Sequence, residues 1–236
     1  MRPVGGKGQI LQMSLIERMD EIETVGDDCY RRIRADIIMA RLKPGFRLKL
    51  EALKESYSVS VTTLRETLNR LAAEGFVLAE GKRGFEVAPV SIENLKELAE
   101  LRLLVETHAL ERSLARADVE WEGRVVSAHH KLASTEKLMD SGIGETEQWK
   151  RYDGEFHQAL ISNCGSATLM EMHATVFDKY FRYQMLAMKY RGEEPARQHR
   201  ELLEAALKRD VGRAKSILAD HINRCVEDTL ENGITR

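Results

Sequence analysis

Residues 59–76 read Val-Ser-Val-Thr-Thr-Leu-Arg-Glu-Thr-Leu-Asn-Arg-Leu-Ala-Ala-Glu-Gly-Phe. Apolar side chains recur at Leu64, Leu68 and Leu71, which is the spacing of one face of a helix, and Gly75 is a typical helix stop. The stretch therefore predicts a short amphipathic helix whose leucine face is buried.

The residues on either side of this helix predict its neighbours. Helical spacing over 28–42 and again over 48–56 predicts two helices before it, and 76–79 and 85–87 predict two strands joined by a basic, glycine-bearing turn. Three short helices and a two-stranded β-wing form a winged helix-turn-helix, in which the third helix enters the DNA major groove.

The charge is divided unevenly along the chain. Residues 29–84 carry 12 Lys and Arg against 6 Asp and Glu, whereas residues 91–236 carry 21 against 25, within a chain of net charge −2. A positive block suits a polyanion-binding module, although a solvated surface would look the same on charge alone. With Pro89 as the break, we expect an arm or extra helix over 1–27, a DNA-binding domain over 28–90 and a second domain over 91–236.

The second segment is helical throughout by pattern. The expected helices span residues 91–116, 118–140, 145–162, 166–189, 195–208 and 210–231, with Gly and Asp residues between them. Six such helices predict an antiparallel bundle, so the fold class is mainly α, with the winged helix-turn-helix at the N-terminus.

All seven histidines lie in this second segment. Asp153 and His157 stand at positions i and i+4 of one predicted helix, so both side chains share a face and could chelate one ion. His199 and His221 stand beside apolar stripes on two later helices. A surface hydrogen-bonded pair and two satisfied core histidines would explain the same residues.

Several motifs resemble the DNA-binding domain of GntR-type bacterial regulators. They are Lys43-Pro-Gly-Phe-Arg-Leu48, the 59–76 stretch and Lys82-Arg-Gly84. The resemblance implies that the DNA contacts come from the recognition helix, its neighbouring loop and the wing, through Arg47, Thr62, Thr63, Arg65, Lys82, Arg83 and the Gly84 backbone. Such contacts are physically reasonable, because Arg can bind guanine through two hydrogen bonds.

Residues 91–230 resemble the FCD domain of the FadR-like subgroup of these regulators. The motifs are Leu101-Arg-Leu-Leu-Val-Glu106, Asp153-x-x-x-His157, His199-Arg-Glu-Leu-Leu and His221. The resemblance implies that Asp153, His157, His199 and His221 hold a divalent cation, and that Arg102 pairs with a carboxylate effector. Three imidazoles and one carboxylate suit Zn²⁺, our first expectation, or Ni²⁺, Mn²⁺ or Fe²⁺, better than Mg²⁺ or Ca²⁺.

These residues predict a ligand-responsive transcriptional regulator that binds a palindromic double-stranded DNA operator as a homodimer. The resemblance implies that it is a repressor, since most regulators of this family are repressors. A secretory signal and an apolar membrane span are absent, and three scattered cysteines fit reduced thiols, so we expect a cytoplasmic protein with no membrane partner. The alternative is a metal-dependent helical-bundle enzyme with an accessory DNA-binding module. We expect no enzyme, because no HExxH-like pairing supplies a catalytic base.

Overall fold

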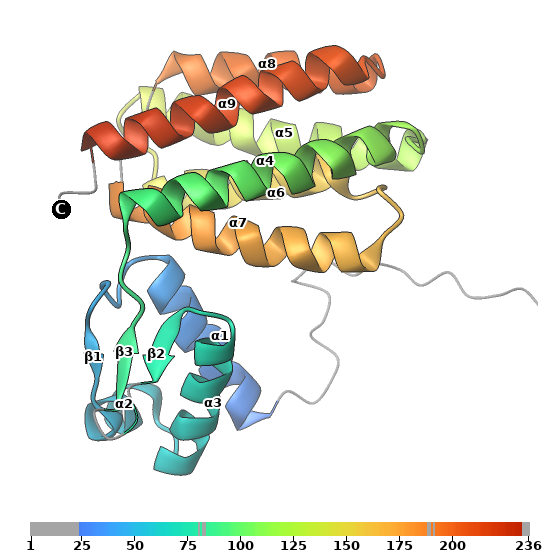
Figure 1. Cartoon of the computed structure of the whole chain (residues 1–236). Coiled ribbons are helices and arrows are strands. Elements are labelled where there is room, and N and C mark those ends of the chain that lie inside the picture. Colours follow the sequence, from blue (N-terminus) through green and yellow to red (C-terminus); the bar gives the residue numbers. More distant parts are fainter. Residues whose placement is uncertain (1–23, 80, 82–83, 188–189, 191, 233–236) are drawn as a thin grey trace, which may run out of the picture.

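The computed structural model describes residues 24–79, 81, 84–187, 190 and 192–232, and Figure 1 shows a small N-terminal head beneath a larger layer of long helices. The element order is α1 (Val25–Ile38), β1 (Arg47–Leu48), α2 (Leu50–Tyr57), α3 (Val61–Ala73), β2 (Val77–Ala79), β3 (Phe85–Val87), α4 (Ile92–Leu114), α5 (Val119–Asp140), α6 (Thr146–Ile161), α7 (Ala167–Ala187), α8 (Glu193–Leu207) and α9 (Val211–Asn232). The mainly α fold class is confirmed. Within the described residues, no helix is both long and apolar enough to cross a membrane.

The head is built around α3. The Ser60 hydroxyl accepts a hydrogen bond from the Thr63 amide at 3.1 Å and so caps the helix, while Leu64, Leu68 and Leu71 are fully buried. These leucines pack with α1, α2 and the sheet in one core. The leucine face predicted from the sequence is therefore confirmed.

Helix α1 begins earlier than the predicted residue 28. The Thr24 hydroxyl accepts from the Asp27 amide at 3.1 Å, which makes Thr24 the N-cap and Val25 the first helical residue. The helix also ends at Ile38 rather than at residue 42, because Ala40 adopts a left-handed conformation with φ +56°. Of the arm or extra helix expected over 1–27, residues 1–23 lie outside the described residues, and residues 24–27 instead form the N-cap and first turn of α1.

The wing has three strands rather than the predicted two. Strands β2 and β3 pair antiparallel with Leu78 opposite Glu86, and the two-residue strand β1 adds to the other edge of β3 with Arg47 opposite the same Glu86. The loop after α1 thus returns to the wing, which places Arg47 on the sheet.

The predicted bundle is confirmed, and each of its helices begins and ends within two residues of the expected bounds. Polar caps explain this agreement: Ser91 accepts from the Asn94 amide ahead of α4, and Asp118 accepts from the Trp121 amide ahead of α5. Apolar side chains from α4, α5, α6, α7, α8 and α9 form one core.

Helix α7 belongs to the bundle but also contacts the head. Phe181 and Met185 of α7 are buried in the core of the head. The Arg34 guanidinium on α1 lies 2.6 Å from Asp178 on α7 and 3.0 Å from Glu74. The face of the bundle nearest the head in Figure 1 is therefore joined to it by both apolar packing and charge.

Candidate metal centre and nucleic-acid interface

Asp153, His157, His199 and His221 lie together inside the bundle. Helix α6 supplies the first two side chains on one face, α8 supplies His199 and α9 supplies His221. All four are buried, and each offers one ligand atom, with these atoms all within 4.8 Å of one another. The four residues predicted to hold a metal are thus brought into one cluster, which we call the D/H cluster.

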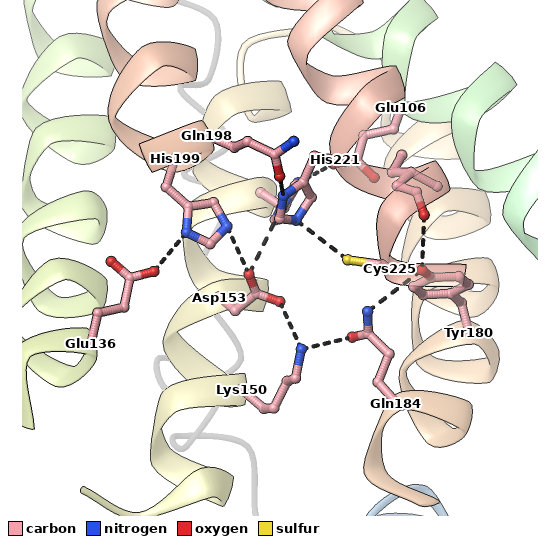
Figure 2. Close-up of polar contacts among 12 residues, drawn as sticks. Glu106, Glu136, Lys150, Asp153, Tyr180, Gln184, Gln198, His199, His221 and Cys225 are labelled. Carbon is pink, nitrogen blue, oxygen red and sulfur yellow. Dashed lines mark hydrogen bonds and ion pairs between the residues drawn. The ribbon is translucent and has the colours of Figure 1, made fainter. Parts of the chain in front are cut away.

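Each histidine of the D/H cluster is oriented by a hydrogen bond at Nδ1. His157 Nδ1 lies 2.5 Å from Glu106 Oε1, His199 Nδ1 lies 2.7 Å from Glu136 Oε1, and His221 Nδ1 lies 3.1 Å from Gln198 Oε1. Figure 2 shows the Glu136 and Gln198 contacts. Acceptors at Nδ1 fix the proton there, which leaves Nε2 as the nitrogen able to bind a metal.

The Nε2 atoms of His157 and His199 are buried and have no hydrogen-bond partner in the structure. Both atoms face the same carboxylate oxygen, because His199 Nε2 lies 3.1 Å and His157 Nε2 lies 3.9 Å from Asp153 Oδ1. A buried polar atom without a partner costs free energy, and a cation shared with Asp153 would remove that cost. The residues present therefore fit a divalent transition metal.

Charges around the D/H cluster favour an ionised carboxylate. Burial opposes ionisation of Asp153, but Lys150, at 3.9 Å, and His199 outweigh it and hold the pKa of Asp153 well below its usual range. Burial likewise opposes protonation of His199, yet Asp153 and Glu136 together raise its pKa. Burial lowers the pKa of His157, against the attraction of Glu106.

Arg102, the predicted effector residue, lies beside the D/H cluster. Its side chain is 1% exposed, its Nε donates to Glu106 Oε2 at 2.7 Å, and its Nη2 lies 3.2 Å from His157 Nδ1. Its guanidinium stacks 4.8 Å from the ring centres of Phe177 and Tyr180. Glu106 thus connects Arg102 to His157 of the D/H cluster.

The sequence did not reveal the residues that support the D/H cluster. Glu106 and Glu136 lie 51 and 63 residues from the histidines that they contact, so no local spacing signals either pair. Lys150 and Gln198 were also missed. His173, which no motif singles out, is buried and lies 3.4 Å from the second oxygen of Glu106.

The predicted DNA contacts on α3 lie at the end of the helix farthest from the bundle (Figure 1). Thr62 and Arg65 are exposed, and no ion pair engages Arg65 in the described part of the chain. The Thr63 hydroxyl, by contrast, lies 2.9 Å from Ser60 Oγ in the helix cap. Arg65 therefore has a guanidinium available for a phosphate or a base.

The remaining predicted contacts belong to the wing. The Arg47 side chain on β1 is 66% exposed and lies 3.9 Å from Glu86. Gly84, just before β3, has φ +91°, a conformation that favours glycine and leaves its backbone uncovered by a side chain. Lys82 and Arg83 lie outside the described residues.

Both domains of the chain match families of bacterial transcriptional regulators. Residues 26–87 match the family described as "Bacterial regulatory proteins, gntR family", and residues 97–224 match the FCD domain. The chain is 36% identical to the HTH-type transcriptional regulator BphR of Paraburkholderia xenovorans, over 88% of this chain and 86% of that protein. It is 30% identical to the HTH-type transcriptional repressor GlaR of Escherichia coli, over 83% and 91%.

A solved structure agrees at the level of the fold. The Escherichia coli protein McbR/YncC superposes with a TM-score of 0.76 at 19% identity, covering 88% of this chain and 98% of its own. The matched families and relatives are regulators of transcription, so the metal-dependent enzyme is set aside. The chain belongs to the GntR family of bacterial transcriptional regulators and carries a C-terminal FCD domain.

Proposed function

We propose that this protein is a FadR-like repressor whose helical domain binds a divalent transition metal and a small carboxylate effector, and so adjusts the affinity of its head for an operator. The observation that carries the proposal is the D/H cluster, in which the buried Nε2 atoms of His157 and His199 have no hydrogen-bond partner while every Nδ1 is held by an acceptor. The similarity to the repressor GlaR supports the direction of regulation.

Asp153, His157, His199 and His221 would hold the metal. Zn²⁺ is the first choice for one carboxylate and three imidazoles, with Ni²⁺, Mn²⁺ and Fe²⁺ as alternatives. When bound, the ion supplies a Lewis-acidic position to which a carboxylate oxygen of an effector can attach. Glu106, Glu136 and Gln198 keep the imidazoles in the tautomer that the ion requires.

Arg102 would bind the effector's carboxylate from the side of α4. Arginine has five N–H donors, and the contacts of this guanidinium with Glu106 and His157 leave donors available. An Arg–carboxylate pair is charge-assisted and strong in a buried site. An acid that binds Arg102 would also change the contacts of Arg102 with Glu106 and, through Glu106, with His157.

Helix α7 would transmit this change to the head. Phe177 and Tyr180 pack on the Arg102 guanidinium, and the residue that follows each of them, Asp178 and Phe181, contacts the head. An effector shifts operator affinity only by binding one arrangement of the head better than the other. A small rotation of α7 would change both its contacts with Arg102 and its contacts with the head.

The head would read DNA as one half of a homodimer on a palindromic operator. Each recognition helix, with Arg65 exposed, offers only a small surface to the DNA. Two such helices binding together reach a higher affinity than one helix alone. We assign residues 28–90, together with the start of α1 at Val25, to this role, and residues 91–236 to metal and effector binding. Binding chromosomal DNA would place the protein in the bacterial cytoplasm.

Binding to the DNA upstream of the protein's own gene tests this proposal. Fluorescence anisotropy with a labelled fragment should show sequence-selective, salt-sensitive binding by the metal-loaded protein, and an organic acid should weaken it. If random DNA of equal length competes as well as the unlabelled upstream fragment, the protein is not an operator-specific repressor.

A further inference from the structure

A cleft of about 150 Å³ lies between the head and the bundle, separate from the D/H cluster. The head contributes Gly75 and Pro89 to its lining, and α7 contributes Lys179, Arg182 and Tyr183. Two of these residues are cations on successive turns of one helix. Among the residues that the structure describes, no Asp or Glu lines the cleft.

Arg182 is buried without a counter-charge. Its side chain is 5% exposed, Nη2 donates to the Ala88 carbonyl, and Nε has no hydrogen-bond partner. No carboxylate pairs with it among the described residues. Burial lowers the pKa of Arg182 to about 10, which reflects the cost of holding this charge away from water, although the group stays protonated at neutral pH.

Other buried or partly buried arginines of this chain show the usual arrangement. Arg102 is paired with Glu106 at 2.7 Å, and Arg34 is paired with Asp178 at 2.6 Å. Buried charges are ordinarily paired, because an uncompensated ion in a low-dielectric environment is expensive. Arg182 departs from this pattern at a place where the structure leaves open space.

Lys179 adds a second positive charge to the same cleft. Its Nζ lies 3.1 Å from the position that a Cβ would occupy at Gly75, so the ammonium group sits against the turn that follows α3. No ion pair holds Lys179 among the residues that the structure describes. The ammonium group and the guanidinium thus approach the same space.

The size of the cleft limits what could fill it. Ligand pockets for drug-sized molecules are roughly 300–1,000 Å³, whereas one water occupies about 30 Å³. A volume of about 150 Å³ suits a small ion with a few waters. A guanidinium binds carboxylate and phosphate oxygens in a fork, and an ammonium group adds a point charge.

We propose that this cleft is a second ligand site, at which Arg182 and Lys179 bind a small oxyanion, a carboxylate or a phosphate, between the head and the bundle. The anion would satisfy Arg182 Nε and offset both charges. Because Gly75 and Pro89 belong to the head, occupancy would stabilise the arrangement of head and bundle seen here. The site does not depend on a metal in the D/H cluster.

Calorimetric titration of the full-length protein tests the site. Inorganic phosphate and acetate would be titrated separately into chelator-treated protein at constant ionic strength, with sodium chloride as the reference. We expect one of the two oxyanions to bind and to raise the melting temperature above that in chloride. The oxyanion that binds identifies the source.

Four variants locate the binding. Arg182→Met and Lys179→Gln should each weaken the oxyanion at least tenfold, whereas Lys137→Gln, an exposed lysine on α5, should bind as wild type. If Arg182→Met does not fold, Lys179→Gln alone decides. Asp153→Ala should retain the affinity, which separates this cleft from the metal centre. No binding beyond that of chloride, or unchanged affinity in Lys179→Gln, would overturn the proposal.

Discussion

The guanidinium of Arg34 on α1 lies 2.6 Å from the carboxylate of Asp178 on α7, and this contact joins the DNA-reading head to the helical domain. The pair is partly buried, and the same arginine also binds Glu74 at 3.0 Å. One residue before Asp178 stands Phe177, which packs on Arg102 beside the D/H cluster. Residues 177 and 178 therefore face the two functional regions of the molecule.

Replacing Asp178 with Asn should weaken the link between these regions. Because Arg34 keeps Glu74, we expect a stability loss of only about 1 kcal/mol by urea denaturation, but a smaller change in operator affinity on adding the effector. Asp28→Asn, which removes an exposed acidic partner on α1, is the matched control. An effector response equal to that of wild type in Asp178→Asn would show that the pair carries no coupling.

Replacing His199 with Ala should abolish stoichiometric metal binding. The wild-type protein should contain about one transition metal ion per chain by elemental analysis. At a metal concentration of 100 times Kd, the ion should stabilise it by about 2.7 kcal/mol. His130→Ala removes an exposed histidine on α5 and should keep both properties. Equal metal content in the two variants would exclude the D/H cluster as the site.

Replacing Glu136 with Ala should weaken metal binding without removing a ligand. Glu136 accepts from His199 Nδ1 at 2.7 Å, and loss of such a partner typically costs 10- to 100-fold in metal affinity. Competition with a chelating dye measures the change. Glu155→Ala, a carboxylate on α6 paired with Lys131, should bind metal as wild type does. Similar affinities in both variants would argue against a role for Glu136 in orienting His199.

Metal affinity should rise with pH above about 6.5, the ordinary pKa of histidine. Asp153 and Glu136 raise the pKa of His199, so in the metal-free protein its proton contributes stability below pH 6.5 that is lost as pH rises through the higher folded pKa. A metal must displace that proton. The lowered pKa of His157 keeps that ring neutral over this range. Competition assays measure the zinc affinity at each pH. An affinity that stays constant with pH would contradict the assignment of His199 as a metal ligand.

Replacing Arg65 with Ala should cost about 1–3 kcal/mol of operator binding if this side chain contacts a base. Arg70→Ala is the control on the same helix, since residue 70 lies about 140° around the helix axis and its guanidinium stacks on Tyr30 instead. Anisotropy titrations at several salt concentrations separate base from phosphate contacts. Equal losses in the two variants would remove Arg65 from the reading surface.

The sequence predicted the helices well where caps are local. Ser60, Ser91 and Asp118 each bond an amide three residues later, a signal that a short window of sequence contains. Strand β1 was missed because two residues carry no periodicity, and it exists only through pairing with β3, about 40 residues away. Local signals therefore gave the helices, and distant pairing gave the third strand.

Part of the candidate site could likewise be predicted from the sequence, and part could not. The spacing of Asp153 and His157 placed both on one face of α6, and family resemblance added His199 and His221. The Glu106 and Glu136 contacts, and the unpaired Arg182, depend on how helices pack against one another. Such contacts become visible only in three dimensions, because packing decides which distant side chains meet.

The most direct test of the account is the operator affinity of metal-loaded protein measured with and without an organic acid, in wild type and in Asp153→Ala. We predict a change of roughly 5- to 150-fold on adding the acid to the wild type, which corresponds to a coupling free energy of 1–3 kcal/mol, and little change in the variant. The same response in both proteins would contradict a metal-dependent effector site in the helical domain.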